Sequence, residues 1–341
     1  MKKNELILSV RDLNIKFNLR GKILHAIRGI DLDVYHGEVL AIVGESGSGK
    51  SVFTKSFMGL LDSNGSITSG TIDYFGADDH QPIRLSELKK EKDWLKVRGH
   101  EIAMIMQDPM TSLNPLKTIG DQIMEAVELH QGLKGAAARE KTLEYLRDVG
   151  IADPEVRFKQ YPHEFSGGMR QRVVIAIAVA CNPQILICDE PTTALDVTIQ
   201  AQVLETMKEL REKFGSAMIM ITHDLGIIAE VCDEVSVVYA GQIVEHGTLE
   251  DVFERTLHPY TEGLFGSLPN IEERRHRLQP IPGLMPDPTD LPKGCCFAPR
   301  CKYCTEACTK ARPEMKWVSD THYVRCSRYD EPGFKIERSV Q

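Results

Sequence analysis

The segment Gly44–Ser51 contains the residues with the clearest chemistry in this chain. Its sequence, Gly-Glu-Ser-Gly-Ser-Gly-Lys-Ser, fits the pattern G-x-x-x-x-G-K-[ST], and the apolar run at 39–43 before it is typical of a buried strand. Glycines let the backbone turn its N–H groups inward onto phosphate oxygens. Lys50 can reach the β- and γ-phosphates, and the Ser51 hydroxyl can ligate Mg²⁺. The spacing predicts a nucleotide site; the alternative is an ordinary Gly/Ser turn between a strand and a helix.

Acidic and histidine side chains follow two further apolar runs. Residues 185–188 are apolar and lead directly into Asp189 and Glu190. Two adjacent carboxylates at the end of a strand are costly unless something uses them. Asp189 is placed to hold Mg²⁺, and Glu190 to orient and deprotonate an attacking water. His223 follows the apolar run 217–222. A lone histidine is more often structural, and two adjacent acids can simply lie at the surface. The phosphate loop in the same chain favours a role in chemistry for all three residues.

A second candidate anion site precedes an apolar helix. Ser166-Gly167-Gly168 at a helix start exposes backbone N–H groups. One chain cannot easily direct both anion sites at one nucleotide, whereas a head-to-tail dimer can. The alternative is an ordinary capped helix.

Composition places the chain among globular proteins. It has 341 residues, 42% hydrophobic and 26% charged, enough for one large domain and a small one, or for two ordinary domains. A net charge of −8 argues against a nucleic-acid partner. We expect no signal peptide, since no long apolar run follows the first lysines. The longest apolar run, Val173 to Cys181, is far shorter than the ~20 residues that span a bilayer, so any work at a membrane requires docking onto other chains.

The order of apolar runs predicts an α/β fold. Strands alternate with helices along most of the chain, which favours a mostly parallel sheet covered by helices, with a helical insertion between two halves of the core. Prolines interrupt the pattern after about residue 260 and indicate a linker. The predicted domains are 1–260, with a helical subdomain at about 86–180, and 261–341, a Pro-rich linker and Cys-rich extension. The predicted strands are within 5–43, near 70–75, 101–106, 184–190, 217–222 and 235–239, and the helices are 52–61, 86–98, several within 116–180, and 201–214.

Six of the nine cysteines fall in the last fifty residues of the chain. The other three, Cys181, Cys188 and Cys232, lie in apolar context and are expected to pack as small hydrophobes. A cytosolic chain keeps its thiols reduced, so the six suggest a metal rather than disulfides. Four thiolates suffice for a [4Fe–4S] cluster or a structural Zn²⁺, and the pair Cys301-x2-Cys304 would suit zinc. The absence of any metal is the third alternative.

Taken together and in this order, the motifs over roughly residues 5–250 resemble those of ATP-binding cassette (ABC) transporter ATPases. The resemblance implies an ABC-type P-loop ATPase: a RecA-like core with an antiparallel β subdomain and a helical subdomain, using ATP and Mg²⁺. It implies Glu190, His223 and Gln107 as catalytic residues and Ser51, Gln107 and Asp189 at Mg²⁺. The implied ATP contacts are Phe17 (adenine, or alternatively a strand core residue), Gly44, Ser46, Gly47, Ser48, Gly49, Lys50, Ser51 and Val52. The signature acting in trans comprises Ser166, Gly167, Gly168, Met169 and Gln171, and the D-loop includes Asp196.

Further segments resemble the oligopeptide/dipeptide (and nickel) importer ATPases, most closely the D-type subunit. They are 110–115, 165–172, 196–200, 258–261 and the tail 294–301. This resemblance implies peptide import driven by ATP-dependent dimer closure at the cytoplasmic face of a bacterial membrane, where the chain is peripheral. The implied partners are an F-type homologous ATPase, two permease subunits docking near 107–116, and an extracellular substrate-binding protein. The family pattern C-x5-C-x6-C with a distal cysteine falls on Cys295, Cys301, Cys308 and Cys326 and implies a [4Fe–4S] cluster, with Cys296 and Cys304 as extras.

Other functions compete with this interpretation. A nickel or metal-chelate importer of the same family shares every motif, and the substrate is not written in this chain. A soluble ABC ATPase acting on DNA or ribosomes is disfavoured, because only about 115 residues separate Ser51 from Ser166 and no heptad run lies between them. A metalloprotein with a purely regulatory nucleotide site is disfavoured by the retention of Glu190 and His223.

Overall fold

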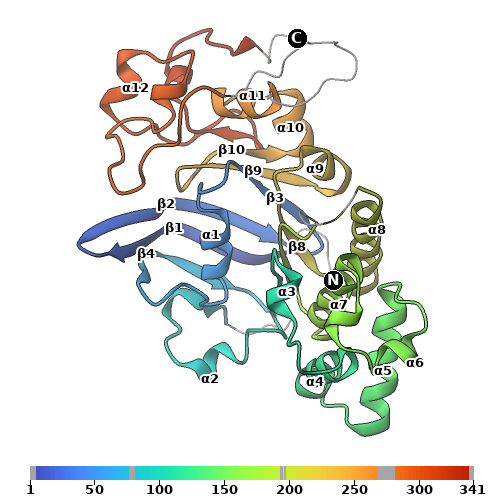
Figure 1. Ribbon diagram of the computed structural model, residues 1–341. Helices are drawn as coiled ribbons and strands as arrows, with labels where there is room; N and C mark the ends of the chain where they lie inside the picture. Colours follow the sequence, from blue (N-terminus) through green and yellow to red (C-terminus); the bar gives the residue numbers. More distant parts are fainter. Residues whose placement is uncertain (1–4, 77–80, 193–194, 196, 267–280, 338–341) are drawn as a thin grey trace.

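The computed structural model describes residues 5–76, 81–192, 195, 197–266 and 281–337, and it contains two sheets (Figure 1). The smaller sheet is antiparallel, with strand order β2–β1–β4–β5. Burial alternates over part of its long strands, as at Leu13, Ile15 and Phe17 of β1, which is typical of a sheet with one packed face. Four consecutive residues are buried at 7–10 and again at 27–30, so both faces are covered there. The strands are β1 (Leu6–Leu19), β2 (Lys22–Tyr35), β4 (Gly65–Tyr74) and β5 (Ile83–Arg84).

The larger sheet has strand order β11–β12–β10–β9–β3–β8–β7–β6, and the five strands from β9 to β6 are parallel. Every residue of β3, β7 and β8 is buried, as expected for strands covered on both faces. The prediction of a mostly parallel sheet is confirmed. The strands are β3 (Val39–Val43), β6 (Ile102–Ile105), β7 (Ile185–Asp189), β8 (Ala217–Ile221), β9 (Glu234–Tyr239), β10 (Gln242–Thr248), β11 (Lys316–Trp317) and β12 (Tyr323–Val324).

Helices cover the parallel sheet and form a separate layer beside it (Figure 1). The separate layer contains α3 (Pro109–Ser112), α4 (Ile119–Gln131), α5 (Gly135–Asp148), α6 (Pro154–Arg157) and α7 (Gly167–Ala180). The other helices are α1 (Lys50–Ser56), α2 (Glu91–Trp94), α8 (Val197–Phe214), α9 (Leu225–Val231), α10 (Leu249–Glu254), α11 (Pro259–Gly266) and α12 (Glu306–Lys310). In the described ranges, no helix is both long and apolar enough to cross a bilayer.

Two sequence-based boundaries differ from the structure. The helical layer begins at Pro109 rather than near residue 86, because β6 pairs with β7 and belongs to the main sheet. The stretch 86–98 is predicted from its sequence to be helical. It contains only the four-residue α2 and the end of a short 3₁₀ helix at Leu85–Glu87. Trp94 at the end of α2 anchors this stretch on Gly59, where a Cβ would lie only 2.4 Å from its ring.

The Cys-rich extension continues the main sheet instead of forming a detached unit. Strand β12 pairs antiparallel with β10, placing Tyr323 opposite His246 and Val324 opposite Glu245. Helix α11 crosses the predicted boundary at 260/261. The predicted boundary at 260/261 therefore falls inside a helix, and the structure shows no gap between two domains there.

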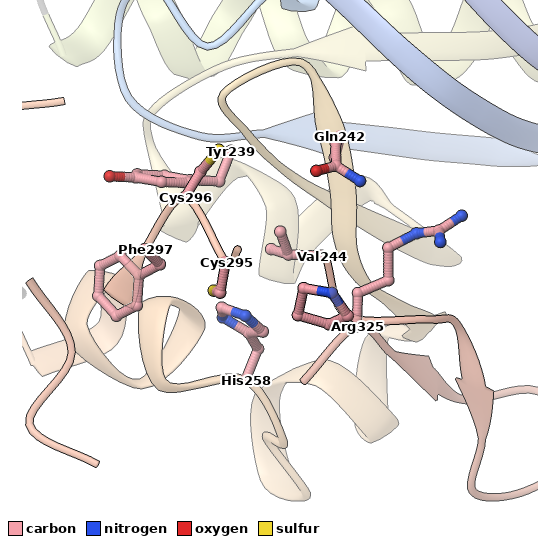
Figure 2. Close-up of a pocket in the computed structure, with 9 residues that line it drawn as sticks. Tyr239, Gln242, Val244, His258, Cys295, Cys296, Phe297 and Arg325 are labelled. Carbon is pink, nitrogen blue, oxygen red and sulfur yellow. The ribbon is translucent and has the colours of Figure 1, made fainter. Parts of the chain in front are cut away.

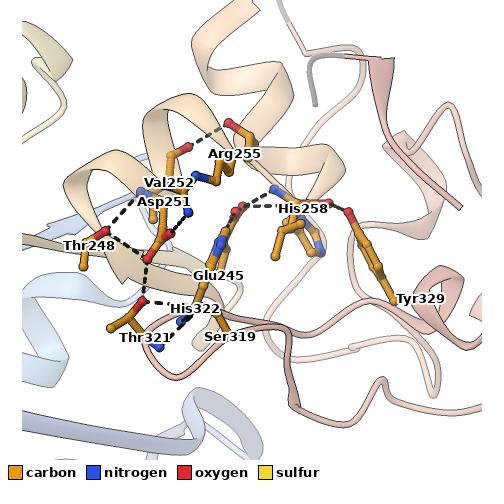
Figure 3. Close-up of polar contacts among 12 residues, drawn as sticks. Glu245, Thr248, Asp251, Val252, Arg255, His258, Ser319, Thr321, His322 and Tyr329 are labelled. Carbon is orange, nitrogen blue, oxygen red and sulfur yellow. Dashed lines mark hydrogen bonds and ion pairs between the residues drawn. The ribbon is translucent and has the colours of Figure 1, made fainter. Parts of the chain in front are cut away.

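A buried carboxylate joins the extension to the cassette (Figure 3). Glu245 on β10 is fully buried, and it accepts hydrogen bonds from the Leu257 N–H at 2.7 Å and the His258 N–H at 2.9 Å. The His322 imidazole of the extension lies 2.9 Å from the same carboxylate. Nearby, Asp251 accepts from the Thr321 hydroxyl at 2.7 Å. Because buried charges are stabilised only when well partnered, this network fixes where the extension docks.

His258 gives this junction a dependence on pH. The side chain is 1% exposed, its Nδ1 accepts from the Tyr260 N–H at 3.0 Å, and burial lowers its pKa from 6.5 to about 3. Protons therefore bind preferentially to the unfolded chain, so the stabilising effect is complete above pH 6.5 and declines as the pH falls from 6.5 towards 3. Each unit by which the pH falls within that window lowers the free energy of unfolding by about 1.4 kcal/mol.

We expect the stability of the wild-type chain to fall more steeply below pH 6.5 than that of His258→Asn, whose amide oxygen can replace the Nδ1 acceptor. Between pH 7.5 and 5.0 the difference in free energy of unfolding between the two should change by about 2 kcal/mol. Urea denaturation at a series of pH values measures it. Parallel curves would show that His258 does not titrate across this range.

Candidate functional site

The loop between β3 and α1 has the backbone shape that a phosphate cradle requires. Gly44 has φ 149°, and a Cβ there would lie 2.2 Å from the Val238 carbonyl oxygen. Gly49 has φ 106°, and its Cβ would lie 2.9 Å from the Ala26 carbonyl oxygen. Larger residues would be strained and would clash at both places. Glycine is thus dictated by close backbone packing at both ends of the loop.

Lys50 lies inside the cradle. It is 7% exposed, and its Nζ donates to the carbonyl oxygens of Gly44 at 2.8 Å and Glu45 at 3.0 Å. Burial lowers the pKa of Lys50, while the nearby acids Glu190 and Asp189 act in the opposite direction. The ammonium is therefore held at the loop, next to the acids that end β7.

Other loop residues also suit an anion. Ser46 and Gly47 are exposed at the tip. The Ser48 hydroxyl is buried and has no hydrogen-bond partner within the described residues. A buried polar atom without a partner is costly, and a bound phosphate oxygen would satisfy it. Val52, on the first turn of α1, is half-buried against the core of the smaller sheet.

Ser51 and Asp189 meet where Mg²⁺ is predicted. The Ser51 hydroxyl donates to Asp189 Oδ1 at 3.1 Å, across 138 residues of sequence. Burial raises the pKa of Asp189, and the hydrogen bond from Ser51 partly offsets this. A hydroxyl beside a carboxylate is a donor set that fits Mg²⁺, which binds proteins through few oxygen ligands.

Glu190 is the centre of a second cluster at the same edge of the sheet. Its φ is +49°, a left-handed conformation that is uncommon for a non-glycine residue, and its N–H donates to the Ile221 carbonyl oxygen at 2.8 Å. Gln107 Nε2 donates to Glu190 Oε2 at 2.9 Å, and His223 Nδ1 lies 3.6 Å from Oε1. The three residues predicted to be catalytic thus converge from the ends of β6, β7 and β8. Backbone strain at such a position is typical of functional sites.

The second predicted anion site lies elsewhere in this chain. Ser166 caps α7, and its hydroxyl accepts from the Met169 N–H at 3.3 Å. Gly168 packs against Ile199 of α8, where a Cβ would lie 2.4 Å from a methyl carbon. Helix α7 lies in the helical layer, away from α1 (Figure 1). One chain therefore does not bring Ser166, Gly167 and Gly168 onto its own phosphate loop.

Two predicted contacts are placed differently from what the motifs suggested. Phe17 is 9% exposed, and its ring lies over Gly65, where a Cβ would be 2.4 Å away, so the structure favours the strand-core alternative for this residue. Gln171 is 1% exposed, and in the described part of the chain its Nε2 is buried without a hydrogen-bond partner, so its side chain is not presented at the protein surface. Asp196 lies outside the described residues.

The cysteines of the tail gather without forming disulfides. All nine cysteines are free thiols. Burial, and to a smaller extent the neighbouring thiols, raises the pKa of Cys295 and Cys301 to about 11 and that of Cys326 to about 12. Cys308 is among those neighbours for all three. Yet no group of three or more His, Cys, Asp or Glu side chains within the described ranges is arranged to hold a metal ion, so the metal is not confirmed.

Cys296 contacts the cassette through a hydrogen bond. Its Sγ accepts from the Arg28 guanidinium at 3.0 Å. It also lines a cavity with room for about one water molecule. Figure 2 shows Cys296, Cys295 and Phe297 of the extension facing Gln242 and Val244 of β10 across this cavity. Cys296 therefore helps dock the tail onto the cassette.

One contact at the phosphate loop was missed from the sequence. Arg300 of the extension forms two hydrogen bonds to the Glu45 carboxylate, at 2.7 and 2.9 Å. The Tyr260 hydroxyl accepts from the Glu45 N–H at 2.8 Å. Both residues lie in segments that resembled importer ATPases, 258–261 and 294–301, but nothing in the sequence pairs them with Glu45.

Comparisons with known proteins agree with the site. Residues 27–193 match the family described as ABC transporter, and residues 244–308 match the oligopeptide/dipeptide transporter, C-terminal region. The oligopeptide transport ATP-binding protein AmiE of Streptococcus pneumoniae is 49% identical over 99% of this chain and 93% of its own length. The dipeptide transport ATP-binding protein DppD of Bacillus subtilis is 49% identical over 96% of both chains. OppD of the same organism, an oligopeptide transport ATP-binding protein, is 51% identical over 97% of this chain and 91% of its own.

Solved structures resemble the cassette part of the chain. The ATP-binding cassette MJ0796, solved as a dimer in a post-hydrolysis state with ADP and Pi, superposes with a TM-score of 0.62 at 25% identity. The match covers 71% of this chain and 98% of that one. For cbiO1 from Clostridium perfringens, part of the transporter complex cbiONQ, the TM-score is 0.61 at 29% identity, over 74% of this chain and 93% of that one.

Proposed function

The chain belongs to the ABC transporter ATPases, in the group of oligopeptide and dipeptide transport ATP-binding subunits, and from this premise we propose that it hydrolyses ATP to power peptide import through a membrane permease. The observation that carries the proposal is the convergence of Gln107 and His223 on Glu190, beside the loop that holds Lys50. Relatives over nearly the whole length of the chain are named for peptide transport.

The residues divide the work of hydrolysis as follows. Backbone N–H groups of 44–49 and the Lys50 ammonium bind the phosphates of ATP. Ser51 and Asp189, with Gln107 nearby, would hold Mg²⁺, which when bound would neutralise negative charge on the phosphates. Glu190 accepts a proton from the attacking water, and His223 at 3.6 Å orients the carboxylate and the γ-phosphate. The held geometry reduces the entropy cost of reaching the transition state.

A second cassette completes the site. Ser166, Gly167, Gly168 and Met169 would bind the γ-phosphate of the ATP held by a partner chain, because they lie in a layer away from their own phosphate loop. Dimeric MJ0796 with ADP and Pi supports this arrangement. For this chain the partner is an F-type homologous ATPase. Closure of the two cassettes on ATP drives the permease between its two states, and hydrolysis releases them.

The remaining partners follow from the same function. Two permease subunits dock on the segment 107–116 and the helical layer, at the cytoplasmic face of the membrane, where the chain is peripheral. An extracellular substrate-binding protein delivers the peptide and sets its length. The contact of Gln107 with Glu190 supports this route, since it links the docking segment directly to the hydrolytic carboxylate.

Reconstitution tests the function. The chain, its cassette partner, the permease and the binding protein are placed in lipid vesicles, and ATP-dependent uptake of labelled di- to pentapeptides is measured beside uptake of nickel. We expect peptides to accumulate and to stimulate ATP hydrolysis. Nickel uptake with no response to any peptide would replace the peptide assignment with the metal-importer alternative.

A [4Fe–4S] cluster bound by Cys295, Cys301, Cys308 and Cys326 is part of this proposal. All four are free thiols, and Cys295, Cys301 and Cys308 each act electrostatically on Cys326, which supports the proposal although the described residues are not arranged as a formed metal site. When bound, the cluster would cross-link the segments that carry these thiols, which is a common way to stabilise a small unit.

We expect anaerobically purified protein to contain about four irons and four sulfides per chain. Cys308→Ser should lose most of this iron, whereas the matched variant Cys304→Ser should retain it, because Cys304 is exposed. Metal analysis and the visible absorption spectrum measure both. Stoichiometric zinc without iron, lost in Cys304→Ser, would contradict the cluster and assign a zinc module instead.

A further inference from the structure

Glu45 is the one acidic residue of the phosphate loop, and all of its polar groups have partners. Its carbonyl oxygen accepts from Lys50 Nζ at 3.0 Å, and its N–H donates to the Tyr260 hydroxyl at 2.8 Å. Its two carboxylate oxygens accept from Arg300 Nη1 at 2.7 Å and Nη2 at 2.9 Å. The residue therefore connects the lysine that binds phosphate to two residues from the C-terminal part of the chain.

A carboxylate at this place needs a partner. ATP brings several negative charges to the same loop, and an unpaired acid within it would repel them. Glu45 is only 28% exposed, so solvent screens its charge incompletely. The bidentate guanidinium neutralises that charge and fixes the direction of the side chain, which a single ammonium does less well.

Arg300 is itself held rigidly. Its side chain is 5% exposed, and its Nε donates to the Pro282 carbonyl oxygen at 2.8 Å. The guanidinium lies 5.8 Å from the ring centre of Tyr239 and 5.9 Å from that of Phe297. Hydrogen bonding to Glu45 raises the pKa of Arg300 well above its usual value. The arginine side chain is thus buried and held in one position by its contacts.

The same aromatic residues support the second contact. The ring centres of Tyr239 on β9 and Tyr260 on α11 are 4.6 Å apart, and Phe297 of the extension packs against both, at 5.3 and 5.4 Å. The Tyr260 side chain is fully buried. Because Tyr260 and Arg300 rest on one aromatic cluster, the backbone and the side chain of Glu45 are held by a single rigid unit.

From these contacts we propose that Arg300 is a positioning residue for ATP binding, which acts through Glu45 and makes the phosphate loop depend on the Cys-rich extension. It does not touch the nucleotide. This inference rests on the proposed role of residues 44–51 in binding phosphate. Through Arg300, the extension sets the affinity of the cassette for ATP.

The test compares ATP binding and hydrolysis by the full chain in four variants. Arg300→Ala should weaken ATP binding and raise KM for ATP about tenfold, because it leaves the Glu45 carboxylate unpaired beside the phosphates, while kcat changes less than about twofold. Arg300→Lys should bind ATP about threefold more weakly than the wild type, since lysine keeps the charge but not the paired hydrogen bonds. Arg300→Ala combined with Glu45→Gln should recover most of the affinity, because the repelling charge is gone. Lys302→Ala, in a surface ion pair of the same extension, should bind ATP normally.

Each outcome decides between the possibilities. If Arg300 only keeps the extension folded, the double variant will bind ATP no better than Arg300→Ala, and the inference fails. It also fails if Arg300→Ala binds ATP within twofold of the wild type. Lys50→Ala, measured in parallel, separates this from the proposed function: unchanged binding in that variant would refute the phosphate loop itself, whatever Arg300 does.

Discussion

Replacing Glu190 by glutamine should lower the rate of ATP hydrolysis at least about a hundredfold while ATP still binds. Glutamine has the same shape and can keep a contact to Gln107, but its amide cannot accept a proton from water. The loop at 44–51 is untouched, so affinity for ATP should remain or increase. Single-turnover hydrolysis with labelled ATP measures the loss directly.

The same variant should trap the closed pair of cassettes. In the wild type, hydrolysis releases the dimer; without turnover, ATP remains bound between the phosphate loop of one chain and the signature of the other. Size-exclusion chromatography with MgATP should therefore show a stable dimer with Glu190→Gln and its partner. Glu205→Gln, which alters an acid that is 65% exposed on α8, is the matched control and should hydrolyse ATP normally. A wild-type rate in Glu190→Gln would remove the assignment of Glu190 as the base.

The second large effect is expected from Lys50→Ala. Loss of the ammonium should reduce ATP affinity by about ten- to a hundredfold, since hydrogen bonds between charged groups are among the stronger ones. Equilibrium titration with MgATP measures this. Unlike Glu190→Gln, which acts after binding, this variant should be defective before any chemistry occurs.

Stability distinguishes a lost binding group from a damaged fold in that experiment. Burial lowers the pKa of Lys50, which means that its charged form is held at a cost to the folded chain. Removing it should therefore leave the thermal midpoint within a few degrees of the wild type, even though two carbonyl contacts are lost. A large drop in the midpoint would mean that Lys50 is structural, and normal ATP affinity would contradict its role at the phosphates.

The chemistry of the site could be predicted from residue types and their spacing. Gly44, Asp189 and Glu190 could be identified because each follows a short apolar run, and in a parallel sheet the ends of such runs meet at one edge. Lys50 could be identified by its fixed spacing from Gly44 in the pattern G-x-x-x-x-G-K-[ST]. The prediction that Gln107 and His223 belong with Glu190 depended on a family resemblance, and the structure brings the three together. Local spacing was sufficient here because strand ends are positioned by the backbone ladder, not by side-chain packing.

Long-range packing, which the sequence does not display, sets which side chains face the site and which residues support it. Phe17 and Gln171 carry plausible residue types, but their exposure depends on the elements packed against them, so the sequence did not reveal that both are buried. Arg300 and Glu45 are separated by 255 residues, and no periodicity relates them. Their pairing exists because β12 joins the sheet beside β10 and the aromatic cluster holds the extension against the loop. Such long-range contacts follow from the global fold, which is why the dependence of the phosphate loop on the extension becomes visible only in three dimensions.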